Sequence, residues 1–226
     1  MNTMNTRWSA ALTAAFLFAG IDAAATTLTF DDLALGTKLS TQYAGVVFAP
    51  NAFPGTSSPS GAWATNTDMT IVSASGGDVG ALGTPSLVSG NVLRSFAAWL
   101  DENGEPSFRV SFVTAIDSFS ADFAGVSTPA DVRLFLYNGN TLLSTVAGSS
   151  TGQFTLAYAA PRITSVIVTP GDSLDYVAVD NIRYQAAVTA IPEPSTWEMA
   201  ALGAFVLTWA SRRKVPGQTK AKPAPA

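Results

Sequence analysis

The 226-residue sequence contains no cysteine and no histidine. The missing cysteine excludes disulfide bonds and thiol nucleophiles, the missing histidine excludes imidazole bases, and together they exclude Cys/His zinc sites. A protein of this composition must be stabilised by its hydrophobic core or by a hard metal ion such as calcium, which binds oxygen ligands.

Charged residues are also scarce, at 12% of the chain, and they are unevenly placed. Residues 26–190 carry thirteen acidic and six basic side chains, whereas five of the twelve basic residues lie in the last fifteen positions. A nucleic-acid partner would need basic residues clustered on the folded body, so the acidic body argues against such a partner. The basic tail is better explained by membrane topology, because positive residues stay on the cytoplasmic side.

The first 25 residues have the layout of a secretory signal peptide. A weakly positive start ends at Arg7, an apolar stretch runs from Trp8 to Ile21, and three alanines follow. We expect cleavage after Ala25, which makes Thr26 the first residue of the exported chain. A buried N-terminal helix is the alternative, but the change to Thr/Leu/Phe alternation directly after the alanines favours a signal peptide.

Three features follow one another near the C-terminus, over residues 191–214. Two prolines around Glu193 restrict the backbone to an extended, non-helical strip. Trp197 stands where aromatic rings prefer a membrane–water boundary, and an apolar run continues from Met199 to Ala210. Basic residues end the run, as at the cytoplasmic end of a membrane segment. The strip and the basic cluster consist of Pro192, Glu193, Pro194, Arg212, Arg213 and Lys214.

This order resembles the PEP-CTERM sorting signal of exported bacterial proteins, and the resemblance covers Pro192 to Lys214. It implies that an integral-membrane exosortase recognises and cleaves the segment after a short transmembrane helix has entered the inner membrane transiently. The protein would then reach the envelope surface or the extracellular matrix of a Gram-negative bacterium. The chain departs from the family pattern at Glu198, at the mouth of the span, and in an added basic tail, residues 215–226, which we expect to be disordered. The run from Trp197 to Ala210 is also shorter than the roughly 20 residues that cross a bilayer, which fits a transient signal better than a lasting anchor.

The body between the two ends, residues 26–190, is one domain dominated by apolar–polar alternation with a period of two. Residues 108–112 and 119–123 show the pattern most clearly, and it predicts half-buried strands. Asn138 and Gly139 predict a two-residue turn that joins two strands into a hairpin. About nine short strands and no helical stripe predict an all-β fold, an antiparallel β-sandwich of jelly-roll type. Besides those two segments, strands are predicted at Thr27–Asp31, Gly45–Phe48, Met69–Ala74, Val132–Tyr137, Asn140–Val146, Gln153–Tyr158, Ile163–Thr169 and Tyr176–Tyr184.

Short stretches of the body resemble the two ends of jelly-roll domains that are common in PEP-CTERM proteins. Thr27–Leu33 and Tyr43–Phe48 resemble their first strands, and Tyr176–Tyr184 resembles their last. Those domains are similar to galactose-binding and carbohydrate-binding-module sandwiches, so the resemblance implies the same fold for this body.

Carboxylate and amide side chains occur near both ends of the body. In such sandwiches the first and last strands tend to be neighbours, which would bring these residues together. Their oxygens are the hard ligands that calcium prefers, so they are candidate ligands of a structural calcium ion. Capping of strand ends or formation of Asx turns is the alternative. The residues are Asp31, Asp32, Asp180 and Asn181.

Two hypotheses follow for the function of the body. The first is a non-enzymatic envelope or matrix protein that binds a glycan or exopolysaccharide, favoured by the missing histidine and the lack of a catalytic motif. Trp63 and Trp99 are candidates for stacking on sugar rings, with core packing as the alternative. The second hypothesis is a secreted glycan-active hydrolase, which requires two converging carboxylates. The candidates for that pair are Asp31, Asp101, Glu102, Glu105 and Asp122, although residues 101–106 also read as a solvated turn.

Overall fold

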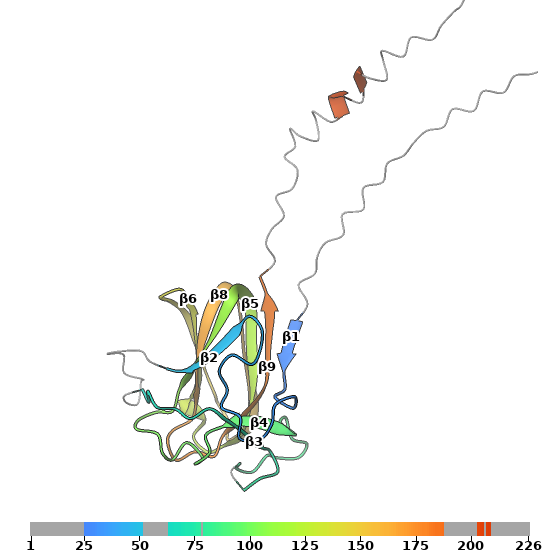
Figure 1. The fold of residues 1–226 in the computed structure, drawn as a ribbon. Helices are drawn as coiled ribbons and strands as arrows, with labels where there is room; N and C mark the ends of the chain where they lie inside the picture. The colour runs from blue at the N-terminus through green and yellow to red at the C-terminus, as the bar shows by residue number, and fades with distance from the viewer. Residues whose placement is uncertain (1–24, 52–62, 78, 188–202, 206, 209–226) are drawn as a thin grey trace, which may run out of the picture. The chain divides into compact units, whose positions relative to one another are not determined.

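The computed structural model describes residues 25–51, 63–77, 79–187, 203–205 and 207–208 (Figure 1). The chain divides into two units, residues 1–188 and 189–226. In the second unit, residues 203–205 and 207–208 are helical, and Thr208 Oγ1 donates a hydrogen bond to the Phe205 carbonyl over 2.9 Å. No helix among the described residues is long and apolar enough to cross a membrane.

The residues that carry the export and sorting predictions fall outside the described residues. They are the signal peptide before Ala25, the sorting residues Pro192, Glu193, Pro194, Arg212, Arg213 and Lys214, and the tail of residues 215–226. Ala25 itself is the first described residue and the first residue of a strand.

The described part of the first unit contains nine strands, all paired antiparallel, and one short 3-10 turn, Pro129–Asp131. The two longest strands, β5 and β8, have 19 residues each. In chain order the strands are β1 (Ala25–Leu28), β2 (Val46–Pro50), β3 (Thr70–Ser73), β4 (Asn91–Arg94), β5 (Phe108–Val126), β6 (Val132–Asn138), β7 (Thr141–Ala147), β8 (Gly152–Pro170) and β9 (Ala178–Ala186).

The long strands β5 and β8 belong to two layers, because each changes partners halfway along. Residues 108–111 of β5 lie between β2 and the second half of β8, whereas residues 118–124 lie between β9 and the first half of β8. The register of β5 against β8 shifts between Ser111 and Ile116 and again before Ser118. Strands that switch layers through such irregularities form the corners of sandwiches.

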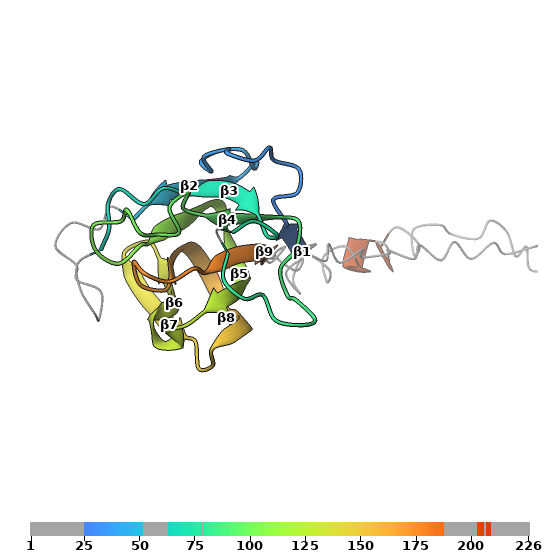
Figure 2. The same cartoon turned by 90° about the horizontal axis from the view of Figure 1, so that it is seen from below.

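We name the layers by one strand each. The β6 layer consists of β2, the first half of β5, the second half of β8, β6 and β7. The β9 layer consists of β1, β3, β4, β9, the second half of β5 and the first half of β8. Figure 2 shows β2 and β3 at one side of the domain and β7 and β8 at the other.

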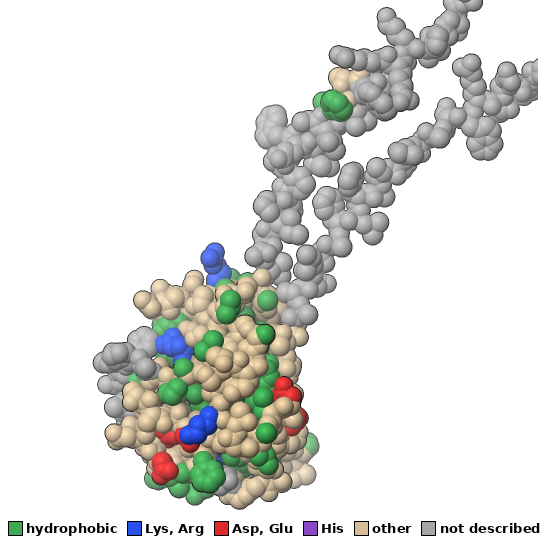
Figure 3. Space-filling model, in the orientation of Figure 1, with side chains coloured by type: hydrophobic (Ala, Val, Ile, Leu, Met, Phe, Trp, Pro, Cys, Tyr) green, Lys and Arg blue, Asp and Glu red, His purple; other side chains and the backbone are tan. Residues whose placement is uncertain are grey.

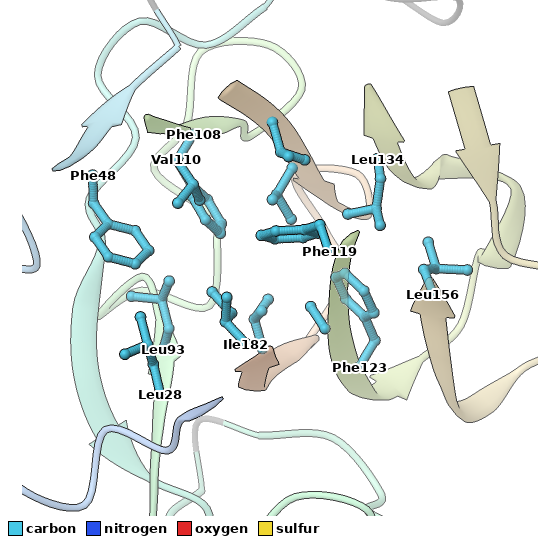
Figure 4. Close-up of a cluster of buried hydrophobic side chains, with 14 of the residues drawn as sticks. Leu28, Phe48, Leu93, Phe108, Val110, Phe119, Phe123, Leu134, Leu156 and Ile182 are labelled. Atoms are coloured by element: carbon cyan, nitrogen blue, oxygen red, sulfur yellow. The ribbon is translucent and has the colours of Figure 1, made fainter. Parts of the chain in front are cut away.

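The core lies between the layers, where period-two alternation turns one side of every strand inward. Phe108 and Leu134 from the β6 layer and Phe119, Phe123 and Ile182 from the β9 layer point into one interior (Figure 4). A smaller apolar cluster, which includes Val72, Val88, Val92, Ala124 and Ala178, lies apart from this core. Figure 3 shows a surface on which charged side chains are few and scattered.

The prediction of an all-β antiparallel fold is confirmed, as is the neighbourhood of the first and last strands, since β1 pairs with β9. The β6–β7 hairpin is also confirmed, but Asn138 pairs with Thr141, so the turn residues are Gly139 and Asn140. Only Gly139 of these two has a positive φ, 57°, which is the pattern of a type II′ turn. The prediction missed β4 and split each of β5 and β8 into two strands.

Candidate binding groove on the β9 layer

An open groove of about 280 Å³ lies on the outer face of the β9 layer. Its floor is low because the outward residues of two adjacent strands are small: Ser118 and Ser120 on β5 stand opposite Ala159 and Ala157 on β8. The inward residues between them, Phe119 among them, are large and fill the core. The same alternation that packs the interior therefore leaves a shallow channel outside, which extends from Ala25 and Arg183 to the strand β8.

Arg183 forms one wall of the groove and is held by a carboxylate. Its Nη1 and Nη2 donate hydrogen bonds to Oδ1 and Oδ2 of Asp122 over 3.0 and 2.9 Å. Asp122 also accepts a 2.6 Å hydrogen bond from Thr155 Oγ1. The Asp122 side chain is only 3% exposed, whereas that of Arg183 is 42% exposed. The hydrogen bonds that Arg183 donates to Asp122 raise the pKa of Arg183, so the guanidinium stays charged and fixed in orientation.

Acidic and amide side chains tie the loop of residues 85–91 to the β9 layer. The Ser89 N–H donates to Asp180 Oδ2, the Asn91 N–H donates to Asp31 Oδ1, and Asn181 Nδ2 donates to the Leu87 carbonyl. Gln153 of β8 accepts from the Leu87 N–H and donates to the Pro85 carbonyl. These contacts are of the capping kind, in which short polar side chains satisfy loop backbone groups.

Asp180 is the most perturbed carboxylate in this region. Burial raises its pKa to about 7, the N–H groups of Asn181 and Ser89 oppose the rise, and the nearby charges of Asp31 and Asp122 add to it. A buried carboxylate close to two others is costly to ionise.

The four predicted calcium ligands serve different contacts. Asp31 and Asp180 are close enough for their charges to interact, and carboxylate oxygens are ligands that a hard cation prefers. Asp32 instead accepts a 2.6 Å hydrogen bond from the Tyr43 hydroxyl, and the Asn181 amide faces Leu87. The described residues hold no group of three or more acidic, His or Cys side chains arranged for a metal. Calcium binding at Asp31 and Asp180 stays a prediction.

Trp63, the predicted sugar-stacking residue, is placed in a small apolar cluster. Its ring makes an edge contact with Phe135 at 5.3 Å between centroids, and Tyr137 and Ile167 complete the cluster. Because Trp63 is only 8% exposed, its faces are not open to a sugar, and the expectation of an exposed platform is wrong. Trp99 is fully buried and its Nε1 donates to the Val177 carbonyl over 2.9 Å, which is the core-packing alternative.

The five carboxylates considered for hydrolysis have other surroundings. None of them lines the groove. Asp122 is bound to Arg183, and Asp31 accepts from the Asn91 N–H. Glu102 and Glu105 are buried, which corrects the expectation of a wholly solvated turn. Glu102 accepts a hydrogen bond from the Asp68 N–H over 2.9 Å, and burial raises its pKa.

No protein-family model matches this chain, and no characterised protein matches it significantly. Among solved structures it is similar to the K2 cleaved adhesin domain of Lys-gingipain, with 14% identity, a TM-score of 0.45, and coverage of 71% of this chain and 99% of that domain. The K1 cleaved adhesin domain of Lys-gingipain from Porphyromonas gingivalis W83 has 13% identity and a TM-score of 0.41, with 72% and 98% covered. A mutant of CBM29-2, a family 29 carbohydrate binding module, has 10% identity and a TM-score of 0.34, with 76% and 100% covered. All three likenesses are distant.

Proposed function

We propose that this protein is an exported, non-enzymatic component of the cell envelope or extracellular matrix whose β-sandwich, of jelly-roll type, binds a glycan. The observation that carries the binding proposal is the groove of small side chains on the β9 layer, walled by a half-exposed arginine that a buried carboxylate fixes in place.

The groove has the chemistry that a sugar chain requires. The hydroxyls of Ser118 and Ser120 donate and accept hydrogen bonds, and the methyl groups of Ala157 and Ala159 offer apolar contact to sugar C–H groups. A guanidinium has five N–H donors, of which Asp122 occupies two on Arg183, so three remain for ligand oxygens. Groups that are held in place before binding lose less entropy when a ligand arrives.

The charge of the protein favours a neutral glycan over an acidic one. Arg183 is neutralised by Asp122, and residues 26–190 carry a net charge of −7. A polyanion would meet overall repulsion without an unpaired cation in the groove to offset it. We therefore assign the groove to neutral hexose polymers.

Isothermal titration calorimetry of the full chain with cellohexaose, mannohexaose and alginate oligomers tests this assignment. We expect binding of at least one neutral oligosaccharide and its loss in Ser120→Tyr, because the phenol ring fills the floor of the groove. Ser111→Tyr is the matched control, since Ser111 occupies the same strand in the β6 layer and its change should leave binding intact. Equal loss in both variants, or binding of alginate alone, would contradict the proposal.

We further propose that export uses the signal peptide and that an exosortase-type enzyme processes the C-terminal signal. The support is the order of features from Pro192 to Lys214. Intact-mass analysis of protein from the native host should show a start at Thr26 and loss of the segment beyond the Pro-Glu-Pro strip. Replacing Glu193 with Ala should leave signal-peptide removal unchanged but retain the C-terminal segment. Full-length C-termini on the mature surface protein would refute the processing step.

A further inference from the structure

The first half of β8 is an open sheet edge. Residues 152–159 pair with β5 on one side, and no described strand pairs with their other side, because β6 joins β8 only from Ser165 to Pro170. The groove runs out to this edge, since Ala157 and Ala159 belong to both. Figure 2 shows β8 at a margin of the domain.

Beyond Gln153, whose side chain contacts the loop of residues 85–87, this edge lacks the features that usually protect exposed strands. Natural edges carry lysines, prolines or inward charges, or are covered by other segments. No charged residue occurs from Leu134 to Pro161, and no proline from Leu134 to Ala160. The opposite margin of the β9 layer is protected, because the loop of residues 36–39 covers β3: the Gly36 N–H donates to the Ile71 carbonyl and the Ile71 N–H to the Thr37 carbonyl.

We propose that two copies of this chain associate through this edge, with the first half of β8 pairing antiparallel to the same strand of a second copy about a two-fold axis. The surface charge favours this occupant. Two bodies of net charge −7 repel each other. Residues 152–159 carry no charge, so this edge offers a contact at which no like charges meet directly. An isologous contact of this kind closes as a dimer.

The side-chain pattern of β8 is compatible with self-pairing. Phe154, Leu156 and Tyr158 face inward and pack against the core, whereas Thr155 and Ala157 are exposed on the outer face. Antiparallel pairing centred near Leu156 sets Phe154 beside the partner's Tyr158 and keeps inward residues next to inward residues. Cross-strand aromatic pairs of this type stabilise sheets.

The dimer has a consequence for ligand binding, and this consequence alone rests on the proposed function. A two-fold axis perpendicular to the sheet places both outer faces on one side. The grooves of the two copies, each ending at Ala157 and Ala159, then meet across the axis in one channel of twice the length. Such a channel suits a polymer rather than a single sugar.

Sedimentation velocity of the full chain tests the dimer. We expect a concentration-dependent dimer that is weakened about tenfold or more in Ala157→Lys and in Ala157→Glu, because the two like charges then lie diagonally across the two-fold axis, each opposite Thr155 of the other copy. Mixing the A157K and A157E proteins should restore the dimer through opposite charges. Ser120→Lys is the matched control: Ser120 is the partner of Ala157 on β5, one strand inside the edge, so the same charge should leave the dimer intact. A monomer in the wild type, or equal weakening by S120K, would overturn the proposal.

The absence of cysteine allows a second test with a direct readout. A mixture of the Thr155→Cys and Ala157→Cys proteins should give disulfide-linked dimers on non-reducing gels, because the register centred on Leu156 sets these two positions opposite each other. Ala159→Cys alone should not, because that register places the two copies of residue 159 far apart. Ser120→Cys should not. If the wild-type protein forms the dimer but binds no neutral oligosaccharide, the dimer is supported and the groove is rejected as a glycan site. If the wild-type protein binds an oligosaccharide but stays monomeric, only the dimer is rejected.

Discussion

The two layers of this sandwich each place an arginine on an outer face, and the two arginines have different environments. Arg183, on the β9 layer, is half exposed and forms a two-pronged ion pair with Asp122. Arg109, on the β6 layer, donates to the Ser165 hydroxyl over 2.8 Å and lies over the Tyr137 ring at 5.4 Å. Burial lowers the pKa of Arg109, whereas the hydrogen bonds that Arg183 donates to Asp122 raise the pKa of Arg183.

The difference between Arg183 and Arg109 shows that the neighbouring side chains determine what an arginine on an outer face can do. On the β6 layer the outward side chains are large, and Trp63 packs with Phe135, Tyr137 and Ile167 over the strands. On the β9 layer the outward side chains near Arg183 are small, so the guanidinium borders open space. Under the proposed function, Arg183 contacts the ligand as well as stabilising the fold, whereas Arg109 has a structural role only.

The largest expected effect separates the two arginines by stability. Arg183→Ala removes the partner of a buried carboxylate and should lower the free energy of unfolding by about 3–5 kcal/mol. Arg109→Ala loses a hydrogen bond and packing and should cost about 1–2 kcal/mol. Urea unfolding measures both. Adding Asp122→Ala to R183A should recover part of the lost free energy of unfolding, since no unpaired buried charge remains. Equal losses in R183A and R109A would show that the two arginines do not differ in their contribution to stability.

The second prediction concerns pH: the protonation of Asp180, on the β9 layer, should make the free energy of unfolding depend on pH. Its folded pKa of about 7 lies above its ordinary value near 3.8, so the folded state binds the proton more tightly than the unfolded state. The free energy of unfolding should therefore fall as pH rises from about 4 to 7, by up to about 4 kcal/mol from this group. Urea midpoints across this range, in a chelator, measure the effect.

The control for the Asp180 prediction is Asp180→Asn, which cannot ionise. The wild type should lose stability relative to D180N as pH rises through this window. A constant difference between the two proteins would show that Asp180 stays ionised, with its pKa held low by contacts that outweigh burial.

Calcium is the third test, because an ion between Asp31 and Asp180 would offset their repulsion. A ligand that binds only the folded state raises the free energy of unfolding by about 2.7 kcal/mol at a hundredfold excess over Kd. Melting the full chain with calcium and with a chelator measures this, and D180A should abolish any shift. If the chelator does not change the melting temperature, Asp31 and Asp180 bind no calcium and serve only to accept hydrogen bonds from the loop backbone.

The strands follow from the sequence better than the site does, for physical reasons. Alternation such as that of residues 108–112 sets the face of each side chain whatever its partner, so most strands could be predicted. β4, Asn91–Arg94, lies in a Gly- and Ser-rich stretch and becomes a strand through pairing with β3 and β9.

The groove depends on the register between neighbouring strands, and the apolar–polar alternation of the sequence does not determine that register. Ser120 stands between Ala157 and Arg183 only because of the pairing of β5 with β8 and β9, and Asp122 meets Arg183 across 61 residues of sequence. The one local signal is the small outward residues of both strands, Ser118, Ser120, Ala157 and Ala159. The burial of Trp63 depends likewise on Phe135, Tyr137 and Ile167, which the chain brings to it from distant strands.

The smallest expected effect concerns the tryptophans and decides which layer meets the ligand. Trp63 Nε1 has no hydrogen-bond partner among the residues that the structure describes, so Trp63→Phe should cost only about 1 kcal/mol of lost packing. Trp99→Phe also removes the hydrogen bond to the Val177 carbonyl, which leaves a buried acceptor without that donor and should cost about 1–2 kcal/mol more. Urea unfolding of the pair measures the difference, and calorimetry with neutral oligosaccharides adds the functional readout. W63F should bind like the wild type, because the ring is buried in the β6 layer; loss of glycan affinity in W63F with unchanged stability would move the binding site to that layer and give Arg109 the role assigned to Arg183.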